Sequence, residues 1–292
     1  MAGLALAASA CTSDVAGGTT VDGAARRAGP APVIAAPSTP YVPSSVHSNA
    51  GIHGTVLLLG EPPASITVRP TMHQRICGSE VTDRTVVTRD QRLADVVVWL
   101  TDIRSGRELG LSRRFAVTNS GCLLEPRVQA VMTGGTLNVR NLDPIPQRTR
   151  ISRHFTRATL AVIDHTDFGQ VVPDDRVLAS PGLLELTSDL HPWTHGWIAV
   201  FDHPYFAVTA ANGAFSLEGV PPGNYTLAAW HERFGRIERQ VTVGAGETVE
   251  ISLTFGRDAG SDSDGGSASL SGEPTVGDSA TPAARSIVSG RD

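Results

Sequence analysis

The sequence predicts an all-β protein. Its apolar runs are short and lie between turn-forming residues, and the 292-residue chain contains 30 glycines and 19 prolines. Strands of about four to eight residues bounded by Gly, Pro and Asn produce this pattern, whereas helices need longer segments with a period of about 3.6 residues. Hydrophobic residues make up 40% of the chain, which is enough for one or two cores.

Twelve runs have the length and composition of strands. The first six are residues 54–60, 65–70, 96–100, 126–132, 136–142 and 183–190. The other six are residues 197–202, 206–209, 213–220, 225–232, 239–243 and 248–255. Gly134-Gly135 predicts a hairpin between the fourth and fifth runs, and Asn212-Gly213 predicts a turn with positive φ.

The charge composition argues against a nucleic-acid partner. The net charge is −5 and the sequence pI is about 6.0, so no basic face is expected. No run reaches the roughly 18 apolar residues that a membrane-spanning helix requires.

Residues 1–11 are similar to the end of a bacterial lipoprotein signal. A short apolar stretch leads into Ala8-Ser9-Ala10-Cys11, which resembles a lipobox. We therefore expect lipidation of Cys11 and a periplasmic or outer-membrane lipoprotein, attached to the membrane through its lipid alone. The alternative is an ordinary apolar N-terminus with an unmodified cysteine.

Two segments lack the large apolar residues of a core. Residues 12–50 consist mostly of Ala, Gly, Pro, Ser and Thr, and residues 257–292 are similar and mildly acidic. Such compositions do not bury enough surface to offset the entropy of ordering. We expect a flexible linker and a disordered tail.

The remaining cysteines, Cys77 and Cys122, each lie in a turn-like context. In an oxidising compartment two such cysteines predict one disulfide bond. Closing a loop of this length removes denatured-state entropy equivalent to about 4 kcal/mol. Two buried free thiols are the alternative.

Two stretches, EPRVQAVMTGGTLNVRNLDP and LLELTSDLHPW, resemble plastocyanin-like exported bacterial proteins of the cupredoxin fold. The resemblance implies a Greek-key β-sandwich, which we assign to residues 51–200. It places Gln147 where the family has its first copper-binding His, Ser188 at the Cys position, His191 at the second His and Thr194 at the Met position.

This substitution pattern predicts loss of the blue-copper site. A blue-copper centre depends on a thiolate, and hydroxyl or amide oxygens are poor replacements. No cofactor is therefore expected. The alternative is copper bound by imidazoles, with His191, His195 and His231 as candidate ligands, because two or three imidazoles bind Cu(II) or Zn(II).

Residues 201–256 resemble the carboxypeptidase regulatory-like domain, a small Ig-like or transthyretin-like β-sandwich. The stretches NGAFSL and VPPGNYTL carry this resemblance. Such a module implies a structural or binding role without catalytic residues. A carbohydrate partner would use aromatic faces, for which the candidates are Trp193, Trp197, Trp230 and Tyr205.

The chain contains no common nucleophile, zinc-protease or phosphate-loop motif. Ser188, Asp189 and His191 are close in sequence, but neighbours along a strand point to opposite faces. The sequence therefore predicts a non-catalytic envelope protein that binds a protein or carbohydrate partner. Copper binding or electron transfer through the histidines is the alternative.

Overall fold

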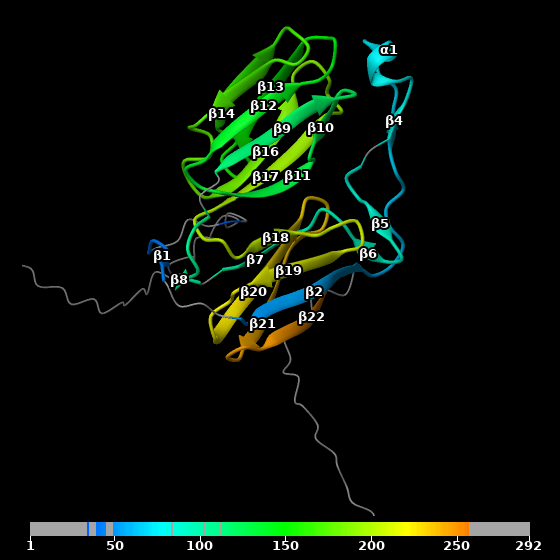
Figure 1. The fold of residues 1–292 in the computed structure, drawn as a ribbon. Coiled ribbons are helices and arrows are strands. Elements are labelled where there is room, and N and C mark those ends of the chain that lie inside the picture. The colour runs from blue at the N-terminus through cyan, green and yellow to red at the C-terminus, as the bar shows by residue number, and fades with distance from the viewer. Residues whose placement is uncertain are drawn as a thin grey trace, which may run out of the picture.

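The computed structural model describes residues 34, 39–44, 49–82, 84–101, 103–110 and 113–256. These residues form two β-sandwiches, and the short helix α1 (Gln74–Cys77) is their only α-helix (Figure 1). The all-β prediction is confirmed. Cys11, most of the expected linker and the expected tail lie outside the described residues.

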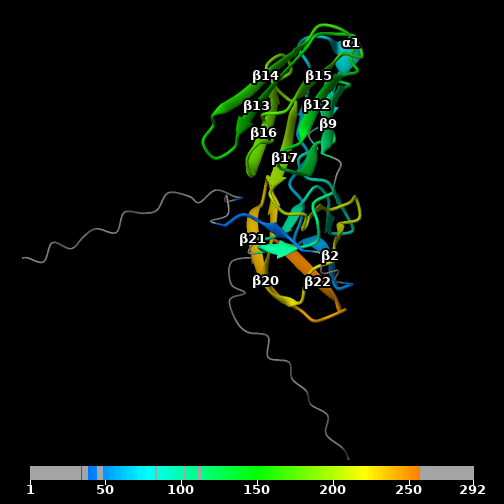
Figure 2. The ribbon, with the colours of Figure 1, turned by 60° about the vertical axis from the view of Figure 1, so that its left-hand side comes forward.

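The first sandwich, called here the inserted sandwich, contains the strands between residues 114 and 201. One sheet has the order β10 (Leu123–Glu125), β9 (Arg114–Ser120), β12 (Thr136–Asn141), β15 (Val171–Asp174). The other has the order β11 (Val128–Met132), β17 (His195–Phe201), β16 (Gly182–Ser188), β13 (Gln147–Arg153), β14 (Thr159–His165). Figure 2 shows β13, β14 and β16 on one side of this sandwich and β9, β12 and β15 on the other.

Alternating apolar residues from both sheets fill the space between them. Leu137 and Val139 of β12 face Leu184 and Leu186 of β16 within one buried cluster. The pairs β9 with β12 and β11 with β17 are parallel, so the chain crosses between the sheets, whereas consecutive strands such as β13 and β14 pair antiparallel within one sheet.

The predicted hairpin at Gly134-Gly135 is wrong. The strands on either side, β11 and β12, belong to different sheets, and β11 pairs in parallel with β17 instead. The turn itself exists, with Gly134 at φ 71°. The glycine pair therefore marks a change of sheet, because the same turn chemistry serves both connections.

The second sandwich, called here the host sandwich, also has two sheets. The first has the order β18 (Phe206–Val208), β7 (Val97–Leu100), β20 (Gly223–His231), β21 (Gly235–Val243). The second has the order β19 (Ala214–Glu218), β2 (Gly51–Leu58), β6 (Arg92–Leu93), β5 (Thr88–Arg89), and β22 (Thr248–Phe255) pairs with β2.

The strands β2, β5, β6 and β7 therefore belong to the host sandwich, so the assignment of residues 51–200 to the inserted sandwich is wrong for this part of the chain. β2 pairs in parallel with β22 along its whole length, and β7 lies between β18 and β20. The chain leaves the host sheet after β7, builds the inserted sandwich and returns at β18. The apolar run 96–100 indicated a buried strand correctly, but a buried run does not identify its partner strand.

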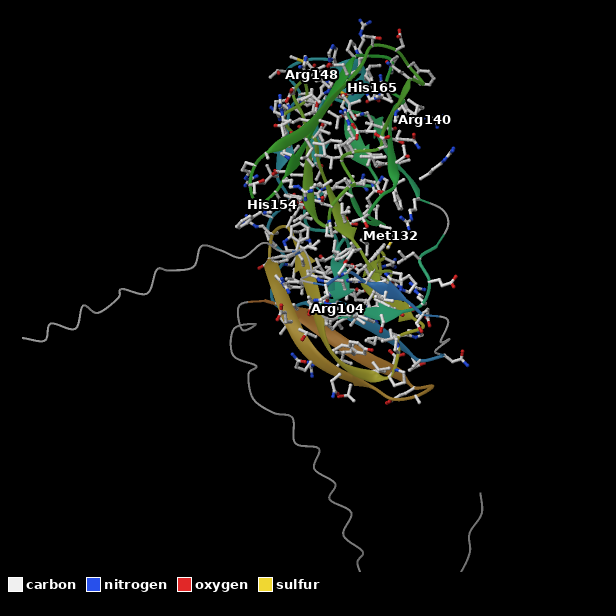
Figure 3. All side chains as sticks on the ribbon, turned by 90° about the vertical axis from the view of Figure 1, so that its left-hand side faces the viewer. Arg104, Met132, Arg140, Arg148, His154 and His165 are labelled. Atoms are coloured by element: carbon white, nitrogen blue, oxygen red, sulfur yellow. A yellow bond between two sulfur atoms is a disulfide. The ribbon has the colours of Figure 1, made fainter. Side chains whose placement is uncertain are left out.

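The two sandwiches share a buried cluster. Trp197 of the inserted sandwich lies edge-to-face on Trp230 of the host, with ring centroids 5.2 Å apart. Trp99 and Phe201 join the same cluster, and their ring centroids are 5.7 Å apart. In Figure 3, Met132 and His154 lie near this junction, whereas Arg148 and His165 lie at the far end of the inserted sandwich.

The connection from β2 to β5, residues 59–82 and 84–87, leaves the host sandwich and runs along the inserted one (Figure 1). It contains β3 (Thr67–Val68), α1 and β4 (Val81–Thr82), and it is fastened by the disulfide Cys77–Cys122. The predicted disulfide is thus confirmed. A separate two-stranded sheet pairs β1 (Val42–Pro43) with β8 (Ser105–Gly106).

None of the helices in the described part of the chain has the length and apolarity needed to cross a membrane.

Candidate functional site

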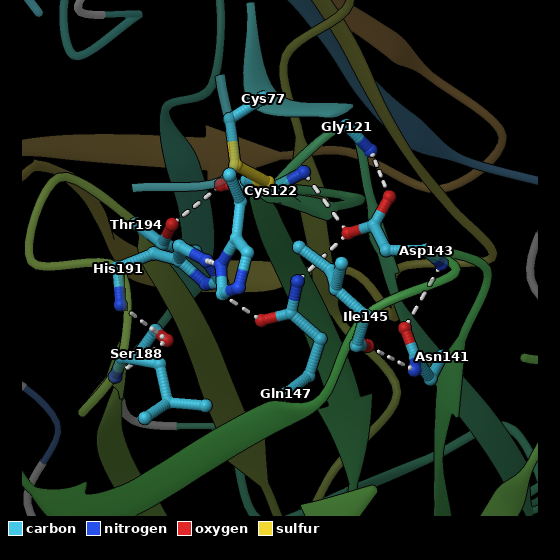
Figure 4. The surroundings of a disulfide bond; sticks show 12 residues. Cys77, Gly121, Cys122, Asn141, Asp143, Ile145, Gln147, Ser188, His191 and Thr194 are labelled. Carbon is cyan, nitrogen blue, oxygen red and sulfur yellow. Dashed lines mark hydrogen bonds between the residues drawn. A yellow bond between two sulfur atoms is a disulfide. The ribbon is translucent and has the colours of Figure 1, made fainter. Parts of the chain in front are cut away.

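Strand alternation brings a set of polar side chains to one end of the inserted core. The inward positions of β12 run from Leu137 to Asn141, and β13 begins with Gln147 facing inward. The inward face of β16 ends with Ser188. Each core-facing row therefore finishes in a buried polar residue near the loops at the disulfide end (Figure 4).

The structure brings together the four positions that the resemblance assigned to copper ligands. Gln147, Ser188, His191 and Thr194 are all buried, and His191 has no exposed surface. Hydrogen bonds connect all four through His191: its ring bonds Gln147, its backbone N–H donates to Ser188, and its carbonyl accepts from the backbone N–H of Thr194.

The His191 ring is held by a relay of side chains. Nδ1 of His191 lies 2.9 Å from Oε1 of Gln147, and the Gln147 amide group donates to Asp143 over 2.8 Å. A carboxylate at Asp143 only accepts, so Gln147 presents its NH₂ to Asp143 and its carbonyl to His191. Nδ1 of His191 therefore carries the proton, and Nε2 keeps a lone pair that accepts a hydrogen bond.

Asp143 is fixed in turn by the backbone. Its carboxylate accepts from the N–H groups of Gly121 (2.6 Å) and Cys122 (3.0 Å), and its own N–H donates to Oδ1 of Asn141 (Figure 4). These bonds tie the loop after β12 to the turn after β9. The Asn-x-Asp part of the motif that carried the resemblance thus supports the His191 relay.

The two hydroxyl positions have structural partners. Oγ of Ser188 accepts from the backbone N–H groups of Leu190 (3.3 Å) and His191 (3.0 Å). Oγ1 of Thr194 donates to the Cys122 carbonyl over 2.5 Å. Neither residue supplies sulfur, and the Gln147 oxygen is already bonded to His191. This donor set does not fit a blue-copper centre, which requires a thiolate.

His73 is a member of the site that the sequence analysis missed. Its Nδ1 lies 3.2 Å from Nε2 of His191, and it caps α1 in the left-handed conformation at φ 55°. Because the His191 tautomer leaves Nε2 as an acceptor, Nδ1–H of His73 donates this bond. His73 lies four residues before Cys77, and the disulfide holds Cys77 next to Cys122, close to His191. This short spacing was the signal in the sequence that His73 lies near the site.

Burial sets the charge of His191. The loss of hydration lowers the pKa of the imidazole below its usual value, and His73 lowers it further, while Asp143 acts in the opposite direction. The ring is therefore neutral at pH 7, in agreement with the tautomer that the Gln147 relay selects.

The ligand atoms of Cys77, Cys122 and His191 all lie within 4.8 Å of one another. Among the described residues this is the only group of three or more His, Cys, Asp or Glu ligands that is close enough for a metal ion. In the present state both cysteine sulfurs belong to the disulfide, so they are not thiolates.

The structure does not assemble the alternative ligand set of His191, His195 and His231. His195 is exposed at the start of β17. His231 is buried in the host sandwich, where its ring stacks on Phe234 with centroids 4.9 Å apart. Burial lowers the pKa of His231 to about 4, so its ring is neutral there.

A cavity of about 310 Å³ lies between the β2–β5 connection and the inserted sandwich. Its walls include Val68, Leu124, Trp193 and His195. Trp193 is the partly exposed member of the four aromatic residues considered for carbohydrate. Trp197, Trp230 and Tyr205 are buried in the cores, so their faces are not available to a sugar.

Ser188, Asp189 and His191 do not form a catalytic arrangement. The Asp189 carboxylate forms a two-pronged bond with Arg150, at 3.0 and 2.7 Å, on the surface. This partner lowers the pKa of Asp189. The hydroxyl of Ser188 bonds backbone N–H groups, as described above.

Comparison with known proteins identifies one family model, that of the carboxypeptidase regulatory-like domain, which matches residues 198–256. No curated protein matches the chain.

Several solved structures align with about a third of the chain. A reduced amicyanin variant is 17% identical over 30% of this chain and 82% of its own, with a TM-score of 0.27. A purple cupredoxin from Nitrosopumilus maritimus is 14% identical over 30% of this chain and 99% of its own, with a TM-score of 0.25. A copper-containing nitrite reductase from Thermus scotoductus is 17% identical over 34% of this chain and 24% of its own, with a TM-score of 0.26.

Residues 198–256 thus match the carboxypeptidase regulatory-like domain, and most of this segment lies in the host sandwich, which β2 and β7 from the N-terminal part of the chain complete. The inserted sandwich lies between β7 and β18.

Proposed function

We propose that this protein is a non-catalytic lipoprotein of a bacterial envelope, with a binding or scaffold role, and that its cupredoxin-like sandwich has lost blue-copper chemistry. One observation carries the proposal. All four copper-ligand positions are occupied by residues that bond to one another or to the backbone: Gln147, Ser188, His191 and Thr194. A polar network of this kind stabilises a loop cluster without a metal.

Export is supported by two features. Cys77 and Cys122 form a disulfide, and disulfides persist in oxidising compartments outside the cytoplasm. The lipobox-like sequence at Cys11 supplies an attachment point. A lipid on Cys11 would hold both sandwiches at a membrane surface, where they are available to an envelope protein or a carbohydrate.

A copper-binding or electron-transfer role is the second candidate. The observation that favours it is the imidazole pair His73–His191, whose nitrogens lie 3.2 Å apart beside two sulfurs. Two imidazoles offer Cu(II) a partial ligand set.

Copper titration of the disulfide-intact protein, followed by EPR, separates the two candidates. The scaffold role predicts no saturable Cu(II) signal and no intense visible band near ~600 nm, since thiolate is absent. A stoichiometric signal that His191→Ala abolishes would establish the second candidate.

The lipoprotein assignment has its own test. Cys11→Ser is expected to prevent incorporation of labelled fatty acid and to release the protein from the membrane fraction. Cys77→Ser serves as the matched cysteine control, because it leaves the lipobox intact. Equal membrane retention of both variants would contradict lipidation at Cys11.

A further inference from the structure

We propose that reduction of the Cys77–Cys122 disulfide converts the His191 cluster into a binding site for one soft cation of the Zn²⁺ or Cu⁺ class. The four ligands would be Cys77, Cys122, His191 and His73. This site goes beyond the scaffold role, which concerns the disulfide-intact protein. It also differs from the blue-copper positions, because three of its four ligands come from elsewhere in the chain.

Three of the four ligand atoms already form a compact group, and His73 adjoins this group through its contact with His191. The sulfurs of Cys77 and Cys122 and a ring nitrogen of His191 already lie within 4.8 Å of one another. The nitrogens of His73 and His191 are 3.2 Å apart. Zn–N bonds of about 2.0 Å at tetrahedral angles place two imidazole nitrogens about 3.3 Å apart, so this pair has nearly the required separation.

The hydrogen bonds that orient the His191 ring are of the kind found around metal-binding histidines. Histidines that bind metals usually donate their second ring N–H to a carbonyl or carboxylate, which fixes the tautomer. His191 does so through Nδ1 to Gln147, and Gln147 is held by Asp143. The remaining nitrogen, Nε2, is directed toward His73. The cluster therefore supplies one ligand that is oriented before any metal arrives.

The ligand set points to the class of cation. Two thiolates and two imidazoles form the tetrahedral S₂N₂ combination that Zn²⁺ prefers, and thiolates also select Cu⁺. The disulfide form lacks both thiolates. The oxidation state of Cys77 and Cys122 would consequently determine whether the site exists.

The redox step requires a dithiol reductant, such as a thioredoxin-type protein. One thiolate of the reductant attacks a sulfur of the disulfide, and its second thiol resolves the mixed disulfide. Two electrons and two protons pass to Cys77 and Cys122, and the reductant leaves as its own disulfide. Binding of the cation then releases the two thiol protons.

The mechanical consequence concerns the β2–β5 connection. Cys77 lies on this connection and Cys122 lies in the turn between β9 and β10, so the disulfide fastens one to the other. A cation held by both cysteines would keep this attachment after reduction. Metal binding would thus replace one cross-link with another at the same place.

The test uses the full chain, reduced with dithiothreitol and desalted without oxygen. Titration with Zn²⁺, and separately with Cu⁺ held by a competing chelator, is expected to saturate at one cation per chain. Co²⁺ is expected to give a sulfur-to-metal charge-transfer band in the same sample. The disulfide-intact protein is expected to show neither.

His73→Ala is the informative variant, because His73 is exposed and its replacement leaves the disulfide and the core in place. We expect its affinity for the cation to fall by more than about 100-fold, beyond the range for outer-shell partners. His195→Ala, at an exposed histidine near the same loops, is the matched control and should bind normally. The absence of saturable binding by the reduced protein would overturn the proposal, as would equal affinities for wild type and His73→Ala.

Discussion

Nε1–H of Trp197 donates a 2.7 Å hydrogen bond to Glu232, and this bond crosses from the inserted sandwich to the host. The same carboxylate pairs with Arg127, and both charged side chains are almost fully enclosed. The contact between the two sandwiches therefore contains a buried ion pair in addition to aromatic rings. Removing one partner of a buried ion pair lowers the free energy of unfolding, so the importance of the junction can be measured by mutation.

Glu232→Ala is expected to lower the free energy of unfolding by about 3–5 kcal/mol, because it leaves the guanidinium of Arg127 buried and unpaired. Urea unfolding monitored by tryptophan fluorescence measures the change. Glu238→Ala, which breaks an exposed pair with Arg236, is the matched control and should cost less than about 1 kcal/mol. Similar losses for the two variants would show that the junction pair contributes no more than a surface pair.

Gln147→Leu is expected to destabilise the inserted sandwich by about 1–3 kcal/mol. The substitution removes the acceptor for Nδ1–H of His191 and a donor to Asp143, and buried polar groups without partners carry a desolvation penalty. Denaturant unfolding gives the size of the effect. Gln129→Leu, at a partly exposed position of β11, provides the control, and an equal loss there would contradict the role of the relay.

His203 predicts a pH-dependent component of stability. It is buried among the rings of Tyr41, Phe201 and Tyr205, and burial, with a further contribution from Arg104, lowers its pKa to about 4.

The unfolded chain takes up a proton at His203 near pH 6.5, whereas the folded chain does so only near pH 4. Stability from this group is therefore fully present above about pH 6.5 and falls by about 1.4 kcal/mol per pH unit below it. His231 and His191 add their own pH dependence, so between pH 7 and 4 the wild type should lose about 1.4 kcal/mol per pH unit more stability than His203→Gln does. Parallel pH profiles for the two proteins would contradict the assignment.

Gly54→Ala is expected to destabilise the host sandwich by about 1–3 kcal/mol or more. A Cβ at this position would lie 2.3 Å from the Ile251 carbonyl oxygen and 2.7 Å from the Phe215 ring, so β2 could not keep its place beside β22. Thermal unfolding measures the effect. Gly110→Ala, where nothing lies within 4 Å of the added atom, should leave the melting temperature nearly unchanged. A comparable loss in both variants would show that the close approach is not what requires glycine.

The sequence allowed local features to be predicted and left distant pairing undetermined. The resemblance of two stretches to plastocyanin-like proteins was what grouped Gln147, Ser188 and His191, and the structure places these residues in one hydrogen-bonded cluster. His73 was missed, because its spacing from Cys77 does not give the path of the β2–β5 connection, on which its contact with His191 depends.

The boundary between the two sandwiches could not be read from the sequence for a related reason. β2 reads as an ordinary strand, and its parallel partner β22 lies at the other end of the described chain. Nothing in the composition of residues 51–58 indicates a partner so far away, and a resemblance that begins near residue 201 shows only the later part of the host sandwich.

The parallel pairing of β2 with β22 also has a consequence for the order in which the molecule matures. A ribosome makes β2 first and β22 last, whereas every strand of the inserted sandwich emerges between them. Domains commonly fold as units while the chain is still growing. All residues of the inserted sandwich therefore precede β22 in the chain, and the pairing of β2 with β22 can form only once the last strand is present.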